Sequence, residues 1–337
     1  MKNNQSFTDA KIPCKGIVTC YGFKNDQGVS IALLRLFGKN KYPGVENAPF
    51  IFWENSEKTP DGRPAEEWEK DGYILVSVAN SKHDDHLLKH RGEKTCSALL
   101  VAEDLGIKDQ PYLKELLKAT FQRDSTGQGT SMDIYHFLKL MHLEWGKTNP
   151  SGVMEWYLQA IEALIVNEWK FFERTLKEFK EKAAIKNCWH QGKKITIASF
   201  ESDDENMSRF ARSKHGAKAD VTIQKNSCGH VYIGSKTNSF IDFDEIVRLV
   251  RIEENKMKTD KHIPEEKLKL PGKLSEVEEW YYGKNERRIL NGSLNNTQTP
   301  ATKIPFEKII SLVMRGLQKQ VRYGNGIEKV KKVYASR

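Results

Sequence analysis

The residues best suited to chemistry in this sequence form the run His83, Asp84, Asp85 and His86. Carboxylate and imidazole groups of this kind bind divalent metal ions. The run comes soon after the apolar stretch at 73–76, whose length and composition are typical of a buried strand in a parallel sheet. Ligands of open α/β sheets bind just beyond the carboxyl ends of the strands. The pattern therefore predicts a site here, and the alternative is a polar surface loop whose histidines have no function.

Two further carboxylates follow predicted elements of the same region. Asp26 lies in a turn between a predicted strand at 15–20 and a predicted helix at 28–37. It is either a helix cap or a carboxylate at the carboxyl end of the first strand. Asp124 lies in a predicted turn at 122–129, which follows a helix. We expect five side chains to converge in one cleft: Asp26, Asp84, Asp85, His86 and Asp124.

The elements that must position these residues alternate between strand and helix, which is the pattern of α/β proteins. A further strand is predicted at 49–54, and helices are predicted at 94–105, 111–121 and 131–145. Because the strands are separated by helices, the sheet of this region is expected to be mainly parallel.

A long helical run at 153–186 divides the chain. It follows turn-forming residues at 149–152, and a strand is predicted again at 194–200. A chain of 337 residues is long enough for two domains. We therefore predict two α/β domains, the first with a mainly parallel sheet, joined by a long connecting helix. The predicted bounds are 1–148 for the first domain, 149–187 for the connector and 188–337 for the second domain.

Basic residues and a glycine-bounded strand mark the second predicted domain. Arg209 and Arg212 lie three positions apart on a short predicted helix, so they share one face. Guanidinium groups form strong hydrogen bonds with phosphate oxygens. Gly229 and His230 lie in a predicted strand at 227–234.

The composition favours a soluble protein with an anionic partner. The formal net charge of +9 is a modest surplus, which favours nucleic acid without requiring it. Five scattered cysteines with no CxxC pair indicate neither a zinc ribbon nor a disulfide framework. No apolar segment resembles a secretory signal or a membrane span. We expect a cytoplasmic protein that does not enter a membrane.

The order of the motifs resembles that of the DHH phosphoesterase superfamily, which includes RecJ-like nucleases, oligoribonucleases and manganese pyrophosphatases. The opening TCYGFKND at 19–26 is similar to the THxGxFHxDE-like motif of the Myg-type exonuclease branch. The strand end at 76–78 stands in the place of that branch's DVGG motif, and 84–86 stands in the place of DHH. The segment 124–127 is similar to a TDTG-type loop whose aspartate is a metal ligand. The second domain resembles the DHH-associated domain, with SCGH at 227–230 where a GGGH-like substrate loop is expected.

The resemblance implies a metal-dependent phosphodiesterase or exonuclease, which acts on nucleic acid or a nucleotide through metal-activated water. The metal is usually manganese, and magnesium is the alternative. The implied metal ligands are Asp26, Asp84, Asp85 and Asp124. The implied catalytic residues are Asp84 and His86. The substrate-binding residues are Gly229, His230, Arg209, Arg212 and Lys24.

Several positions depart from the family pattern, and the departures fall on metal ligands. Cys20 and Lys24 stand at or near two histidines of the opening motif. Ser77 replaces an aspartate, Asn80 replaces a glycine, and Asp85 replaces the middle histidine of DHH. The Lys24 ammonium could take the place of a metal ion and contact phosphate. Three hypotheses remain. The first is a divergent manganese-dependent hydrolase, and the second is a catalytically silent relative without a metal, which binds nucleic acid, a nucleotide or a protein partner. The third is another α/β enzyme whose likeness to the superfamily is accidental.

Overall fold

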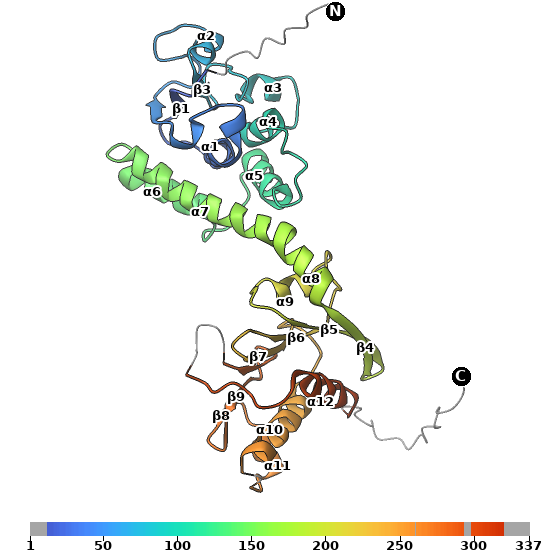
Figure 1. Cartoon of the computed structure of the whole chain (residues 1–337). Helices are drawn as coiled ribbons and strands as arrows, with labels where there is room; N and C mark the ends of the chain where they lie inside the picture. Colours follow the sequence, from blue (N-terminus) through green and yellow to red (C-terminus); the bar gives the residue numbers. More distant parts are fainter. Residues whose placement is uncertain (1–11, 260, 293–297, 320–337) are drawn as a thin grey trace, which may run out of the picture. The chain divides into compact units, whose positions relative to one another are not determined.

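The computed structural model describes residues 12–259, 261–292 and 298–319. The chain forms two compact units, Met1–Phe172 (unit 1) and Glu173–Arg337 (unit 2), and each contains helices and strands (Figure 1). The predicted fold class of two α/β domains is confirmed. Among the described residues, no helix combines the length and the apolar character needed to cross a membrane. The basic segment at 320–337 lies outside the described residues.

Unit 1 is built on a three-stranded parallel sheet. Its strands are β1 (Gly16–Cys20), β2 (Phe50–Trp53) and β3 (Tyr73–Leu75), in the order β2-β1-β3. The central strand β1 pairs in parallel with both neighbours. The carboxyl ends of the three strands therefore meet at one edge of the sheet, where ligands of such sheets bind.

The two faces of this sheet are buried in separate cores, because successive side chains of a strand point to opposite faces. Ile17 packs in the larger core together with residues of α1 (Asn25–Phe37). Val18 packs in a smaller core with Trp68 of α2 (Ala65–Lys70). Burial on both faces explains why these strands consist of apolar runs instead of alternating apolar and polar residues.

Helices cover the larger core. Short 3-10 segments follow α1 at Gly38–Asn40 and Val45–Asn47. The other α-helices described in unit 1 are α3 (His86–His90), α4 (Ser97–Asp104), α5 (Lys114–Thr126), α6 (Ile134–Trp145) and α7 (Pro150–Lys170). Helix α1 contacts α4, α5 and α7, so the helix that follows the first strand lies at the centre of this layer (Figure 1).

Two predicted boundaries in unit 1 were wrong. Helix α1 begins at Asn25 and not at position 28, so Asp26 lies in its first turn. The turn predicted at 122–129 is helical over its first half, because α5 continues to Thr126. No glycine or proline interrupts α5 before Gly127, whose left-handed φ of 65° ends the helix. Asp124 is therefore held on a helix and not in a loop.

The boundary between the units falls inside the stretch predicted as a connector, 149–187. Helix α7 buries Tyr157 and Ile161 in the larger core of unit 1. A π-helical turn follows at Phe171–Thr175, and α8 (Leu176–Lys182) belongs to unit 2. The apolar face of the long helix is thus used for packing within unit 1. The helix predicted to run to 186 ends earlier, and β4 begins at Ala184.

Unit 2 contains a seven-stranded mixed sheet in the order β4-β5-β6-β7-β10-β9-β8. The β5–β6 pair is parallel, and the other pairs are antiparallel. The strands are β4 (Ala184–His190), β5 (Lys193–Glu201), β6 (Val221–Lys225), β7 (Val231–Ser235), β8 (Gly272–Leu274), β9 (Val277–Gly283) and β10 (Arg288–Asn291). The described helices are α8, α9 (Met207–Arg212), α10 (Asp244–Lys258), α11 (Glu265–Leu268) and α12 (Phe306–Lys319).

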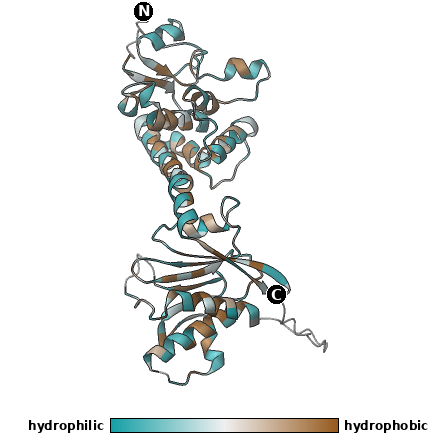
Figure 2. Ribbon diagram, turned by 45° about the vertical axis from the view of Figure 1, so that its right-hand side comes forward, coloured by the Kyte–Doolittle hydropathy of each residue, from teal (hydrophilic) through white to brown (hydrophobic). Residues whose placement is uncertain are grey.

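The core of unit 2 forms between this sheet and the helices α10 and α12, which contribute Val250 and Val313. Figure 2 shows that helices of both units carry hydrophobic residues on part of their surface and hydrophilic residues on the rest. The strand predicted at 227–234 begins later, at Val231, and the glycine-containing segment before it is a turn. Strands β4, β8, β9 and β10 were not predicted from the sequence.

Candidate active site

The loop between β3 and α3 has an unusual backbone. Ser77, Ala79 and Asn80 have left-handed φ angles of 54°, 55° and 53°. Residues other than glycine rarely adopt this region, and they stay there only where surrounding contacts fix them. The Ala79 amide donates to the carbonyl of Ser56 (2.7 Å), and the Asn80 amide donates to Asp84 Oδ2 (2.9 Å). Contacts on both sides therefore hold the loop in this conformation.

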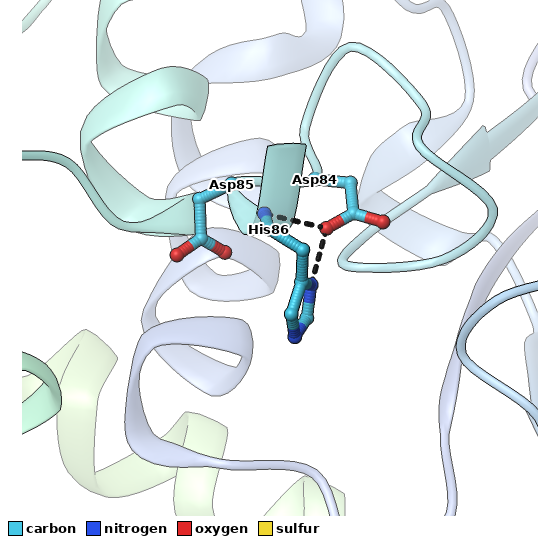
Figure 3. A group of neighbouring side chains, drawn as sticks. All are labelled: Asp84, Asp85 and His86. Atoms are coloured by element: carbon cyan, nitrogen blue, oxygen red, sulfur yellow. Dashed lines mark hydrogen bonds and ion pairs between the residues drawn. The ribbon is translucent and has the colours of Figure 1, made fainter. Parts of the chain in front are cut away.

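Asp84 uses both carboxylate oxygens to hold this loop. Besides its bond from Asn80, it accepts at Oδ1 from the His86 amide (3.1 Å) and from His86 Nδ1 (2.5 Å) (Figure 3). Because a carboxylate only accepts, Nδ1 must carry the hydrogen of this bond. The His86 side chain is 50% exposed. Asp84 thus fixes both the ring orientation and the tautomer of a half-exposed imidazole.

Asp85 contacts a different set of residues, and Figure 3 shows the side chains of Asp85 and Asp84 on either side of the His86 ring. Asp85 Oδ1 lies 3.2 Å from Ser97 Oγ, which lies 3.0 Å from Asp26 Oδ2. Lys89 forms an ion pair with Asp85 and a second one with Asp124, where Nζ lies 2.5 Å from Oδ2. These contacts join five side chains into what we call the acidic cluster: Asp26, Asp85, Lys89, Ser97 and Asp124.

The hydroxyl of Ser97 links two carboxylates. It donates to Asp26 Oδ2 and lies within donating distance of Asp85 Oδ1, and it also contacts the hydroxyl of Ser77. Burial, followed by the charges of Asp124 and Asp85, raises the pKa of Asp26, although the hydrogen bond from Ser97 lowers it.

The acidic cluster holds more negative groups than positive ones. Its three carboxylates share the single ammonium of Lys89. Burial lowers the pKa of Lys89, but the hydrogen bonds and charges of Asp124 and Asp85 outweigh burial and raise it above its ordinary value. Asp26 is only 4% exposed, and its Oδ1 has no hydrogen-bond partner among the described residues. A buried carboxylate oxygen without a partner is costly, so this oxygen favours either a proton or a cation.

The structure brings together the carboxylates that the sequence singled out. Asp26 comes from α1, Asp85 from the residue before α3, and Asp124 from α5. Asp84 and His86 adjoin Asp85 in the chain and make their own pair beside it. The roles of these residues as metal ligands or catalytic groups stay predictions.

Sequence reasoning missed two members of the acidic cluster, Lys89 and Ser97. Lys89 lies four residues after Asp85, which is the spacing of an ion pair on a helix, so a signal for it was present. Ser97 is separated from Asp26 by 71 positions and begins α4. No local pattern marks that contact.

The donor set suits one hard divalent cation. Asp84, Asp85 and His86 each offer an atom, and these atoms lie within 4.8 Å of one another. Carboxylate oxygens and imidazole are ligands that manganese accepts, and magnesium prefers oxygen. Asp26, whose Oδ1 has no partner among the described residues, is not part of this group. The residues therefore fit one such ion, provided that Lys89 gives up its contacts.

Three of the positions that depart from the motifs of the resemblance, Ser77, Cys20 and Lys24, belong to no group of potential metal ligands among the described residues. Ser77 Oγ is buried and contacts Ser97. Burial and the charge of Asp84 raise the pKa of Cys20 to about 11, so its thiol is protonated at neutral pH. Lys24 is exposed and precedes α1, where its backbone amide donates to Gln27 Oε1 (2.6 Å). Contact of Lys24 with phosphate stays a prediction.

Unit 2 contains a pocket of about 330 Å³ that includes two of the predicted substrate residues, Arg212 and His230. Arg212 Nη1 donates to Tyr232 Oη (3.2 Å), and His230 Nε2 donates to the Thr299 carbonyl (2.9 Å). Asp203 also lines the pocket, so its charge is mixed.

The other two predicted substrate residues in unit 2 do not line this pocket. Gly229 lies in the turn before β7 with φ 82°, where its amide donates to the Asn226 carbonyl (3.0 Å). Arg209 is exposed on α9 and is not among the described residues that line the pocket. Of the two arginines, Arg212 lines this pocket, and contact of either one with a substrate stays a prediction.

Comparisons with known proteins leave the family open. No family model matches the chain, and no curated protein matches it. Among solved structures, an uncharacterized protein from Helicobacter pylori G27 is 9% identical, with a TM-score of 0.24 over 90% of this chain and 99% of that one. A TM-score this low does not indicate a shared fold.

Proposed function

We propose that unit 1 carries a phosphodiesterase site of the DHH type, which depends on one divalent cation and acts on a nucleotide or a short nucleic acid. The observation that carries the proposal is the acidic cluster, in which carboxylates from distant parts of the chain meet around a buried oxygen without a partner. Buried carboxylates gathered in this way are costly unless a proton or a cation compensates them. The resemblance of the motif order supplies the reaction class.

The residues of this chain divide the work between them. The resemblance implies that Asp26, Asp84, Asp85 and Asp124 would hold manganese or magnesium, and donor atoms of Asp84 and Asp85 lie together with one of His86 within 4.8 Å of one another. The bound ion would supply a Lewis acid and lower the pKa of water. Because His86 gives its Nδ1 hydrogen to Asp84, its Nε2 is the atom that can accept a proton or, once protonated, donate to a phosphate oxygen.

The partner that fits this site is an anion. The formal net charge of +9 favours a polyanion over a neutral substrate. In unit 2, the pocket that contains Arg212 and His230 offers polar groups for an anion of its own. We expect the protein to act in a reducing, cytoplasmic compartment, which agrees with its five free cysteines.

The test is hydrolysis of bis(p-nitrophenyl) phosphate and of a short oligonucleotide, with and without manganese or magnesium. Asp26→Asn and Asp124→Asn should each lower cation-dependent turnover at least about a hundredfold, because each removes a charge that would hold the ion. The matched control is Asp109→Asn, an exposed carboxylate outside the cluster, which should leave turnover unchanged. Turnover that survives both cluster substitutions would contradict the proposal.

Asp84→Ala is a weaker test than the motif order suggests. Asp84 is buried and accepts from Asn80 and His86 in the strained loop. Its removal is expected to disturb the loop as well as any catalysis. A loss of activity in that variant would not separate the two effects, whereas the asparagine variants keep the shape of the replaced side chain.

A second candidate function is a catalytically silent module that binds nucleic acid or a nucleotide. The observation that favours it is Lys89, whose ammonium already pairs with Asp85 and Asp124. Ser77, which stands where the resemblance expects an aspartate, adds no negative charge. Binding of a single-stranded oligonucleotide without cation-dependent hydrolysis would favour this candidate over the enzyme.

A further inference from the structure

Lys89 occupies the position in the acidic cluster where a cation would be most stable. Its Nζ lies 2.5 Å from Asp124 Oδ2 and also pairs with Asp85. The carboxylates of Asp85 and Asp124 are buried, with 3% and 9% of their side chains exposed. Two buried carboxylates of like charge repel each other unless a positive charge lies between them. The ammonium therefore serves as their counter-ion.

The route by which Lys89 could leave is also present. Its side chain is 37% exposed, and it extends from the short helix α3 over a flexible four-carbon stem. An ammonium is strongly hydrated, so it is stable in water when it withdraws. Asp85 and Asp124 have no such alternative, because Asp85 is buried and only 9% of the Asp124 side chain is exposed.

An ammonium and a divalent ion compete for these carboxylates. Lys89 Nζ contacts Oδ2 of both Asp85 and Asp124, so an ion that binds those two oxygens takes the place of the ammonium. An ion bound beside the ammonium would be repelled by it, because like charges repel strongly in a poorly solvated site.

We propose that Lys89 competes with the divalent cation for Asp85 and Asp124, and so acts as a built-in counter-ion that must withdraw before the cation binds. The inference rests on the proposed function only in taking a divalent cation as the ligand of the site. It assigns to Lys89 the role of setting the cation affinity. Lys89 stabilises the folded protein when the cation is absent, and it weakens cation binding by the free energy needed to displace it.

The experiment measures manganese binding to the full chain by isothermal titration calorimetry, and melting temperature in EDTA and in manganese. Lys89→Met removes the charge and keeps the apolar stem. This variant should bind manganese at least about tenfold more tightly than the wild type. It should also melt at a lower temperature in EDTA and gain more from manganese than the wild type gains. The matched control is Lys94→Met, an exposed lysine of the same region, which should behave as the wild type does.

Each outcome decides the question. Equal manganese affinity in Lys89→Met and wild type would overturn the proposal. If Lys89→Met does not fold in EDTA, one sample is refolded with manganese and a second one with sodium alone, and Lys89→Gln is treated in the same way. A cooperative fold that returns in the manganese sample but not in the sodium sample supports competition. Failure of both variants to refold with manganese overturns the proposal. This experiment measures binding and stability, and the hydrolysis assay described above measures turnover separately. Tighter manganese binding by Lys89→Met, together with no hydrolysis by the wild type, would refute the proposed function and leave this inference intact.

Discussion

At the residue scale, the properties of the acidic cluster depend on its protons and charges more than on its shape. Three carboxylates, one hydroxyl and one ammonium are in contact, and Asp26 has a raised pKa. A carboxyl group whose pKa is raised in the folded chain binds its proton more tightly there than in the unfolded chain. Its effect on stability is unfavourable at high pH, shrinks as the pH falls through the folded pKa and is absent below the unfolded pKa.

This reasoning predicts the stability of Asp26→Asn. The amide imitates the protonated acid, so at neutral pH and without a cation the variant should be at least as stable as the wild type. As the pH falls through the raised pKa of Asp26, the wild type should approach the variant. Urea unfolding in EDTA, at several pH values from neutral to mildly acidic, measures both effects. A variant that is less stable at neutral pH would show that the Asp26 charge is already compensated.

At the element scale, the position of Asp26 depends on how α1 packs on α7. Gly28 lies two residues after Asp26, and a Cβ there would lie 2.4 Å from the ring of Tyr157. The Tyr157 hydroxyl donates to Asn25 Oδ1 (2.6 Å), at the start of α1. Both contacts come from a helix that the sequence assigned to a connector. Helix α7 thus fixes the first turn of α1 and with it the position of the Asp26 carboxylate.

Gly28→Ala tests this packing. Alanine normally favours a helix over glycine by about 1 kcal/mol. Here the added methyl group must push α1 and α7 apart, so we expect a net loss of about 1–3 kcal/mol in the free energy of unfolding. The matched comparison is the same substitution in a Tyr157→Leu background, where the loss should shrink because the ring is gone. An equal loss in both backgrounds would show that Tyr157 is not the obstacle.

At the scale of the whole molecule, the chain forms two units with separate hydrophobic cores and carries a net positive charge. The two α/β units are each closed around their own hydrophobic residues, and the formal net charge of the chain is +9. A surplus of this kind acts at long range and is screened by salt. It affects which partners approach the protein, and it does not determine the fold.

Binding of a single-stranded oligonucleotide should therefore depend on salt. We expect the affinity to fall by about tenfold or more between about 50 and about 200 mM salt, because binding releases counter-ions from the phosphates. Fluorescence anisotropy of a labelled oligonucleotide measures this, in EDTA so that nothing is hydrolysed. The control is a morpholino oligomer of the same sequence, whose uncharged backbone should bind far more weakly. Equal binding of the two oligomers would remove the electrostatic argument for a nucleic acid partner.

The sequence by itself determined the local features of this protein. Apolar runs bounded by turn residues predicted β1, β2 and β3, and helical periodicity predicted α4 and α6 to within a few residues. These signals are local, because they depend on which residues follow one another in a stretch of about ten. The alternation of strand and helix then placed Asp26 and Asp85 at the same edge of a parallel sheet, since such strands end together.

Only the tertiary structure decided which groups touch. Ser97 meets Asp26 across 71 positions, and Lys89 meets Asp124 across 35. Helix α7 belongs to the core of unit 1 because its apolar face packs against α1, although the sequence analysis assigned it to a connector. Long-range contacts of this kind depend on how whole faces pack, and a local pattern of residues does not contain that information. The sequence therefore contained Lys89 at helical spacing from Asp85, but only the fold showed that Lys89 also pairs with Asp124.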